Sequence, residues 1–223
     1  MARLSRGETA KPRRKAEEQA LSRTSTVAFL DLVGGRQGHF GLESGHHSRL
    51  WLDLGSLFAD PGPIEPFVTG LTEAIRPYQV SGVCGPLLGG AFLAQLLAQR
   101  LAAEFYYAER EMPGDPHGLY RARYRVPATL AARAAGKRLA IVDDVMSAGS
   151  ALRGTYVDLQ AHGATCVLAG ALLVLGSTGA GFFAGQGVPV EAMARQDFEL
   201  WEPAQCLLCA AGMPLEDMSV GTR

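Results

Sequence analysis

Two periodicities of hydrophobic and polar positions alternate along the chain. Short, mostly apolar runs, which are typical of buried strands, occupy residues 80–84, 105–109, 139–142 and the stretch that begins at Thr165. Segments with helical spacing separate them, as in residues 64–76, where Phe67, Leu71 and Ile75 share one face. Strands that alternate with helices through short connections predict an α/β fold, with a mostly parallel sheet and helices on both of its faces.

Two further strand patterns surround polar loops. Residues 38–54 read as two short strands around a Ser-Gly-His-His turn. Residues 119–126 alternate strictly, which predicts a strand after the Gly- and Pro-containing loop at 110–118. Side chains alternate across a strand, so one face should carry the arginines and the other the intervening residues. The arginine face would consist of Arg121, Arg123 and Arg125.

Composition narrows the class of protein. The 223 residues suffice for one α/β core, and 48% hydrophobic with 19% charged residues is ordinary for a soluble globular protein. A net charge of −1 gives no general reason to expect a nucleic acid partner.

Residues 1–24 are basic and lack the apolar core of a secretory signal, so a solvated, disordered tail is expected, with an RNA-contacting arm as the alternative. The longest apolar run, residues 166–176, is too short to span a bilayer.

The four cysteines fall into two groups. Cys84 and Cys166 lie in apolar strand-like segments and are expected to be inert core thiols. Cys206 and Cys209 form a CxxC motif without a second pair. Zinc needs four ligands, so a zinc site here requires both pairs of a dimer or ligands from elsewhere in the chain. The alternative is a structural or weakly redox-active pair. The absence of a disulfide framework fits a reducing cytoplasm.

The strongest chemical pattern is "LAIVDDVMSAGSALRGT" at residues 139–155. A buried strand here leads to two adjacent carboxylates, Asp143 and Asp144, then to a turn of small residues and a helix. The first turn of a helix offers free backbone N–H groups and the positive end of the dipole, which together bind anions. An acidic pair beside such a cradle suits a ligand that carries both hydroxyls and phosphate. The alternative is a plain turn with Asp144 as a residue of the helix approach.

This combination closely resembles the phosphoribosyl-pyrophosphate (PRPP) motif of the type I phosphoribosyltransferases, and the flanking "ALRGT" is most similar to the orotate enzymes. Three other segments are similar to family segments in the same order: "FGLESGHHS" from Phe40, "GPLLGGAFLA" from Gly85 and "WEPAQCLLCAAGMPL" from Trp201. The resemblance implies the type I phosphoribosyltransferase fold over residues 25–223 as a single domain. It also implies a small hood built from residues 38–54 and 195–223.

The resemblance also implies a reaction. The family transfers ribose 5-phosphate from PRPP to a base, here orotate, giving orotidine 5'-phosphate and pyrophosphate. Mg²⁺ is the implied cofactor, held mostly by pyrophosphate, ribose hydroxyls and water. A homodimer that shares a loop across its interface is the implied assembly, and no membrane partner is expected. The alternatives are a phosphoribosyltransferase for another base and a non-catalytic, PRPP-sensing regulatory protein.

Residue roles follow from the matched motifs. Asp143 and Asp144 would accept hydrogen bonds from the ribose hydroxyls, and as strand-end carboxylates they are expected to be exposed and to repel each other. The ribose 5-phosphate cradle would consist of Val145, Met146, Ser147, Ala148, Gly149 and Ser150. The pyrophosphate loop would consist of Gly85, Pro86, Leu87, Leu88, Gly89 and Gly90, with a cis bond expected at Leu87–Leu88. The base would lie against Phe40, Ser44 and Gly45.

The chain departs from the family pattern in its positive charges. Family members usually carry two lysines in the loop that here reads "AEREMPGDPHGLYRARYR", which contains none. Arg110 and His117 are the counterparts that the sequence offers, and Arg121, Arg123 and Arg125 are candidates to replace the lysines toward pyrophosphate. Orotate enzymes also tend to place an arginine after the strand "ALLVLG", where this chain has "GSTG", and some place a lysine where it has Glu43.

Overall fold

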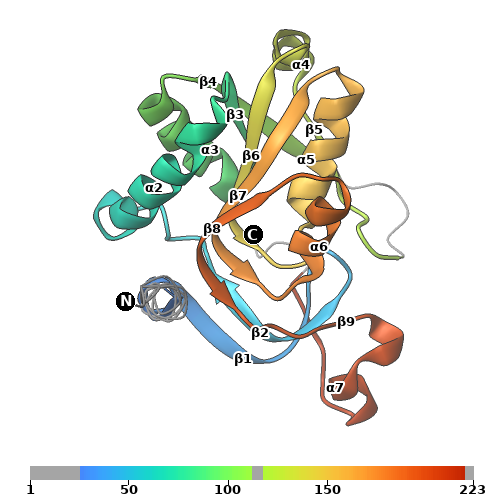
Figure 1. Cartoon of the computed structure of the whole chain (residues 1–223). Helices are drawn as coiled ribbons and strands as arrows, with labels where there is room; N and C mark the ends of the chain where they lie inside the picture. The colour runs from blue at the N-terminus through green and yellow to red at the C-terminus, as the bar shows by residue number, and fades with distance from the viewer. Residues whose placement is uncertain (1–25, 112–117, 219–223) are drawn as a thin grey trace, which may run out of the picture.

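A six-stranded sheet forms the centre of the protein (Figure 1). The computed structural model describes residues 26–111 and 118–218, so the predicted basic tail lies outside the described residues. The strand order is β5-β4-β3-β6-β7-β8, and every pairing is parallel except that of β5 with β4. The parallel sheet predicted from the sequence is thus confirmed. The strands are β3 (Gly82–Pro86), β4 (Glu104–Glu111), β5 (Arg123–Arg125), β6 (Arg138–Met146), β7 (Thr165–Leu175) and β8 (Val190–Gln196).

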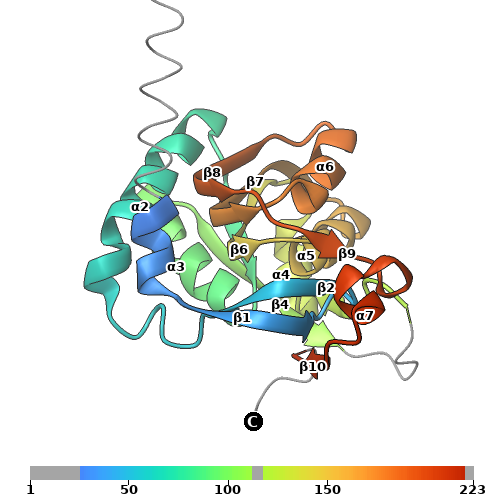
Figure 2. The same ribbon diagram turned by 90° about the horizontal axis from the view of Figure 1, so that it is seen from below.

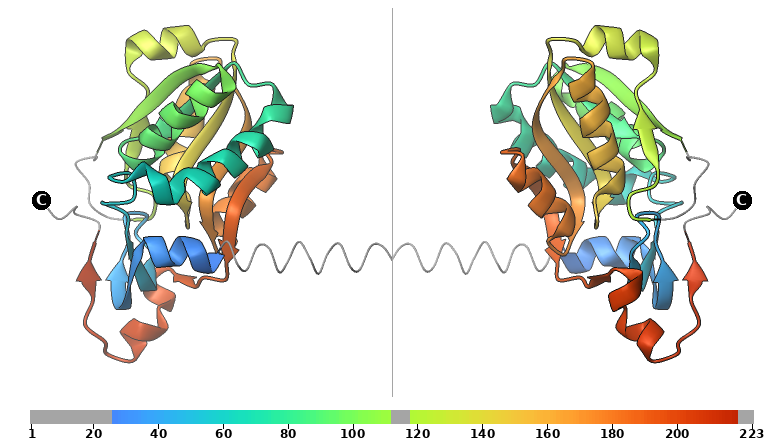
Figure 3. Two further views of the ribbon diagram at one scale, coloured as in Figure 1. Left: turned by 90° about the vertical axis from the view of Figure 1, so that its left-hand side faces the viewer. Right: turned by 90° about the vertical axis from the view of Figure 1, so that its right-hand side faces the viewer.

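Helices cover both faces of this sheet, as the side views of Figure 3 show. Helices α2 (Pro61–Ile75) and α3 (Gly89–Leu101) pack on one face, and α4 (Ala128–Ala134), α5 (Ser150–Ala161) and α6 (Thr178–Gly185) on the other. Alternate residues of β6 divide accordingly. Leu139 and Ile141 join the apolar cluster of α5, whereas Ala140 and Val142 join that of α2 and α3. A short 3₁₀ turn, η1 (Arg76–Tyr78), follows α2.

A second, smaller sheet forms the predicted hood below the first, and it joins distant parts of the chain (Figure 2). Its strand order is β10-β1-β2-β9, and β10 runs parallel to β1. The hairpin starts at Gly34, four residues before the predicted start. The elements are β1 (Gly34–Gly41), β2 (His47–Asp53), β9 (Leu200–Trp201), η2 (Pro203–Gln205), α7 (Leu207–Ala210) and β10 (Glu216–Asp217).

Two predicted elements have different bounds in the structure. The strand expected at 119–126 is only three residues long, because Tyr120 adopts a left-handed backbone with φ of 54° and interrupts the extended chain before Arg123. Strand β6 is longer than expected and continues through Met146. Its neighbour β7 keeps pairing with it to the end, so Asp143 and Asp144 lie inside the strand and not beyond it.

The two core cysteines behave as the sequence predicts. Cys84 is fully buried and Cys166 is 5% exposed. Burial raises the pKa of the Cys166 thiol to about 12, so the thiol stays protonated and unreactive at neutral pH. Within the described residues, no helix has both the length and the apolar character that a bilayer crossing requires.

Candidate active site

A cavity of about 340 Å³ lies between the hood and the large sheet. Strand β6 contributes Asp143 to its wall, and the turn that follows contributes Ser147, Gly149 and Ser150. The hood contributes residues of β2 and of the β1–β2 turn, including Trp51. Ligands of parallel sheets bind at the carboxyl ends of the strands, which is where this cavity lies.

The acidic pair divides between the cavity and the interior. Asp143 is half-buried and lines the cavity, whereas Asp144 is only 8% exposed and does not line it. The expectation that both carboxylates are exposed is therefore wrong. The reason is that Gly89 and Gly90 cover them: a Cβ at Gly89 would lie 2.1 Å from Asp144 Oδ2, and one at Gly90 would lie 2.8 Å from Asp143 Oδ1.

Electrostatics supports the expected repulsion between the two carboxylates. Burial, and then the charge of Asp144, raises the pKa of Asp143 well above its ordinary value. Glu43 adds a further negative charge nearby. Burial also raises the pKa of Asp144, although the backbone N–H of Val145 donates to Asp144 Oδ1 at 2.8 Å. This cluster of three carboxylates, Asp143, Asp144 and Glu43, favours a ligand that brings hydroxyl donors or positive charge.

The predicted pyrophosphate loop connects β3 to α3. Its Leu87–Leu88 peptide bond is cis, as expected from the resemblance. Gly85 must be glycine here, because a Cβ would lie 1.9 Å from the carbonyl oxygen of Gly90. The loop thus packs its own backbone closely and presents Leu87 and Leu88 on the outside, 40% and 69% exposed.

The predicted phosphate cradle is the turn that opens α5. Gly149 precedes the helix with φ of 73° and provides no side-chain cap, so the N–H groups of the first helical turn have no capping side chain. Of the six predicted cradle residues, Val145, Ser147, Gly149 and Ser150 line the cavity. Met146 and Ala148 are each 1% exposed and support the turn from beneath.

Glu43 makes contacts at the edge of the cradle. Its Oε1 accepts hydrogen bonds from Ser150 Oγ at 3.1 Å and from the Tyr124 hydroxyl at 2.8 Å. Its Oε2 lies 3.2 Å from Arg110 Nε. Burial and the neighbouring Glu43 raise the pKa of Tyr124, which keeps its hydroxyl a donor. The Glu43 carboxylate therefore takes a hydrogen bond from Ser150, one of the hydroxyls of the predicted cradle.

The arginine row lies outside this cavity. Arg123 and Arg125 are exposed while Ala122 and Tyr124 are buried, which confirms the alternation. Arg125 binds the buried Asp158 at 3.1 Å and lies 3.6 Å from Glu111, so it compensates a structural carboxylate. None of Arg121, Arg123 and Arg125 lines the cavity. His117 lies outside the described residues, and its predicted role stays a prediction.

The predicted base side is formed by the β1–β2 turn. Ser44 lines the cavity, and Gly45 has φ of 82° with the carbonyl oxygen of Gly118 2.8 Å from where a Cβ would stand. Phe40 does not line the cavity, contrary to expectation. Its ring is 2% exposed inside the hood, with the Arg36 guanidinium 5.4 Å from its centroid, and Trp51 of β2 is the aromatic residue that lines the cavity.

Known proteins match this chain over most of its length. The orotate phosphoribosyltransferase of Thermotoga maritima is 30% identical over 180 residues, which cover 81% of this chain and 89% of that protein. The chain belongs to the orotate phosphoribosyltransferase family. No family model matches the chain.

Solved phosphoribosyltransferase structures have the same fold as this chain. The crystal structure of orotate phosphoribosyltransferase from Aeropyrum pernix has a TM-score of 0.59 at 23% identity and covers 77% of this chain and 93% of its own. The adenine phosphoribosyltransferase structure from Thermoanaerobacter pseudethanolicus has a TM-score of 0.54 at 16% identity, covering 66% of this chain and 88% of its own. At these identities the matches show the fold, which is that of the type I phosphoribosyltransferases.

Two charged residues near the cradle, Glu43 and Arg153, could not be assigned a role from the sequence pattern. The sequence shows Glu43 only as a position where some family members carry lysine, since its contact with Ser150 spans 107 residues and no local pattern predicts it. Arg153 lies one helical turn after Ser150, with its guanidinium 4.2 Å from the Tyr120 ring and 4.5 Å from the Phe182 ring. The arginine in "ALRGT" was the available signal for Arg153. Glu43 adds negative charge at the cradle, and Arg153 lines a second cavity that Ser150 also lines.

Proposed function

We propose that the protein transfers ribose 5-phosphate from PRPP to orotate, forming orotidine 5'-phosphate and pyrophosphate. The observation that carries the proposal is one cavity lined by Asp143, by the α5 cradle and by Trp51 of the hood. This arrangement supplies a partner for ribose hydroxyls, an anion site and an aromatic wall in one place. Membership of the orotate phosphoribosyltransferase family supports the choice of base.

The chemistry assigns a role to each part of the cavity. The bond from ribose C1 to the pyrophosphate oxygen breaks and pyrophosphate leaves with the electron pair. A base nitrogen forms the new bond to C1 and releases its proton to solvent. Positive charge develops at C1 as the leaving group departs. The carboxylate of Asp143, held by its hydrogen bond from the Asp144 N–H at 3.1 Å, places fixed negative charge beside that centre.

The cradle would hold the 5-phosphate of PRPP. The backbone N–H groups at the start of α5 and the hydroxyls of Ser147 and Ser150 are the donors that line the cavity. Ser150 then has to exchange its hydrogen bond to Glu43 for one to phosphate. The glycines at 85, 89 and 90 leave room for pyrophosphate oxygens near the backbone.

Mg²⁺ is the proposed cofactor. The oxygen-rich surroundings formed by Asp143, Asp144 and Glu43 carry excess negative charge, and oxygen is the donor that Mg²⁺ takes. The ion would be held chiefly by pyrophosphate, ribose hydroxyls and water, and would neutralise the leaving group. We also propose a cytoplasmic location, since no disulfide joins any two of the four cysteines, as is usual in a reducing compartment.

The missing cations favour one alternative, a base without a carboxylate. No lysine or arginine in the described ranges 26–111 and 118–218 lines the cavity, whereas orotate and PRPP are both anions. A homodimer supplies the missing positive charge if the arginines of one chain at 110, 121, 123 and 125 reach the cavity of the other. We propose this assembly for the active protein, because none of these four arginines lines the cavity of its own chain.

The test is a panel of bases with PRPP and Mg²⁺, in which pyrophosphate release is measured. Orotate is expected to give the highest kcat/KM, and the Asp143→Asn/Asp144→Asn protein, as the matched control, no release above background. Turnover of uracil or a purine in preference to orotate would replace the substrate assignment. PRPP binding by calorimetry without release on any base would indicate the non-catalytic, PRPP-sensing alternative.

A further inference from the structure

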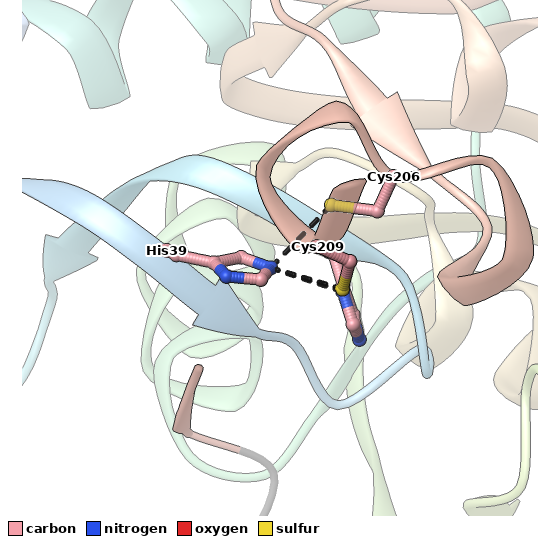
Figure 4. Close-up of side chains that lie close together, drawn as sticks. His39, Cys206 and Cys209 are labelled. Atoms are coloured by element: carbon pink, nitrogen blue, oxygen red, sulfur yellow. Dashed lines mark hydrogen bonds between the residues drawn. The ribbon is translucent and has the colours of Figure 1, made fainter. Parts of the chain in front are cut away.

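Four potential metal ligands meet in the hood, away from the cavity. They are His39 of β1, His47 of β2, and Cys206 and Cys209 at the start of and within α7. All four ligand atoms lie within 4.8 Å of one another. A zinc site at the CxxC motif needs two further ligands from elsewhere in the chain, and His39 and His47 are in the position to provide them. Figure 4 shows the His39 ring and both cysteine sulfurs pointing toward one another.

Four of the six distances between these ligand atoms lie near those of a tetrahedral metal centre. His39 Nε2 lies 3.4 Å from Cys206 Sγ, 3.7 Å from Cys209 Sγ and 3.1 Å from His47 Nδ1. Cys209 Sγ lies 3.3 Å from His47 Nδ1. For a tetrahedron around zinc, bonds of about 2.3 Å to sulfur and about 2.0 Å to nitrogen require edges of about 3.3 to 3.8 Å.

Hydrogen bonding alone leaves this arrangement unexplained. His39 Nδ1 lies 2.9 Å from the carbonyl oxygen of Met213, which can only accept, so Nδ1 carries the proton. His39 Nε2 then has one lone pair, yet three groups approach it: both sulfurs and His47 Nδ1. One metal ion can bond to all four atoms at once. A carbonyl on the far nitrogen is also the support that metal-bound histidines usually have.

We propose that His39, His47, Cys206 and Cys209 bind one structural zinc ion per chain. Two sulfur and two nitrogen ligands at tetrahedral spacing are typical of zinc. Four protein ligands close the coordination shell, so the ion has no open position for a substrate. His39, His47 and Cys206 are buried, and Cys209 is at the surface.

The site would join the first hairpin of the hood to its last segment. Strands β9 and β10 are two residues long each, so their backbone pairing alone holds this segment weakly. Both cysteines lie in the connection between these strands. The hairpin in turn lines the cavity through Leu42, Ser44 and Trp51. The zinc ion therefore fixes one wall of the cavity without entering it.

The test measures metal in the full chain, purified without a histidine tag and without chelators. Elemental analysis should find about one zinc per chain, and Cys209→Ser should lose it. The matched controls Cys166→Ala and His162→Asn lie outside the cluster and should keep it. Replacement of zinc by cobalt(II) should give the charge-transfer absorption of cobalt–thiolate bonds in the wild type and not in Cys209→Ser.

A measurement on the wild type alone covers the case in which Cys209→Ser does not fold. Titration of its thiols with an organomercurial should release one zinc per chain, which an indicator dye reports. The proposal is overturned if the reduced wild type binds neither zinc nor cobalt, or if folded Cys209→Ser retains both. A Cys206–Cys209 disulfide in the freshly purified protein, seen as a mass lower by two hydrogens, would also overturn it.

Discussion

At the scale of residues, the charged form of Asp143 is destabilised by burial and by the carboxylates around it. Its pKa is raised by burial and by the carboxylates of Asp144 and Glu43, so the folded state binds its proton more tightly than the unfolded state does. The free energy of unfolding therefore falls as pH rises from the ordinary carboxyl pKa, about 3.9, through the raised one. Function is served here at the expense of stability.

This predicts a pH-dependent gain for the Asp143→Asn/Asp144→Asn protein. Turnover should be abolished, because fixed negative charge at the ribose is lost. The midpoint of thermal unfolding should exceed that of the wild type at pH 8, and the gain should shrink at pH 4, where the wild-type carboxylates regain protons. Calorimetric melts at both pH values measure it. A variant that melts lower at both would assign the pair to the fold.

Glu43 offers a second residue-scale prediction. Glu43→Gln keeps an oxygen that can accept from Ser150 and Tyr124 but removes a negative charge from the cradle. An incoming 5-phosphate then meets less repulsion, so KM for PRPP should fall about fivefold, corresponding to about 1 kcal/mol. Steady-state kinetics with PRPP varied is the measurement. Glu65→Gln, on an exposed face of α2, is the control and should change nothing. A rise in KM would show that Glu43 helps to bind PRPP.

At the scale of elements, the β3–α3 loop is fixed by close backbone packing. Gly85→Ala should cost at least about 3 kcal/mol of unfolding free energy, because its Cβ would lie 1.9 Å from a backbone oxygen. Gly181→Ala in α6 meets nothing within 4 Å and should stabilise by about 0.5–1 kcal/mol. Urea unfolding of both proteins compares the two sites. Equal stabilities would mean that the loop backbone relaxes freely.

The sequence predicts elements well where the signal is local. The strand–acid–small-residue–helix pattern at 139–155 identified β6, the cradle and α5, because all the residues involved are neighbours. Helix α4 has no such signal, since its sequence ATLAARA has no clear apolar and polar faces. Strand β5 is shorter than the alternating pattern predicts. The left-handed backbone of Tyr120 ends the extended chain, and the alternation of side chains contains no sign of it.

Contacts between distant segments account for the rest of the site. His39 and Cys206 are 167 positions apart, and only the pairing of the hood strands brings them together. The Glu43–Ser150 contact likewise depends on how the hood closes over the large sheet. Local patterns contain no information on such approaches. The CxxC motif indicates Cys206 and Cys209 as candidate zinc ligands, but their approach to His39 and His47 and the carboxylate at the cradle are seen only in the structure.

At the scale of the whole molecule, the cation deficit of the cavity can be tested by mixing subunits. An Asp144→Asn protein and an Arg110→Ala/Arg123→Ala protein should each be nearly inactive. If arginines act across a dimer, the mixed dimer regains one working site. An equal mixture that exchanges freely should then recover about a quarter of wild-type turnover. Pyrophosphate release after co-refolding measures it.

The same experiment distinguishes the contrary arrangement. Arg110 Nε lies 3.2 Å from Glu43 Oε2 of its own chain, which is the starting point for action within one subunit. In that case the mixture stays as inactive as its parents. The control is a mixture of wild type with Arg133→Ala, an exposed arginine that does not line the cavity, which should retain full turnover under either arrangement.

The pairing of β10 with β1 imposes an order on folding during synthesis. Strand β1 precedes every strand of the large sheet in the chain and β10 follows all of them, yet the two strands share one sheet. Domains generally fold from the N-terminus during synthesis. The large sheet is complete once β8 has emerged. At that point β10, the outer neighbour of β1, has not yet been made. A nascent chain stalled before Cys206 would thus carry a finished core and an open hood, so the hood wall of the cavity takes its final place only after β10 has emerged.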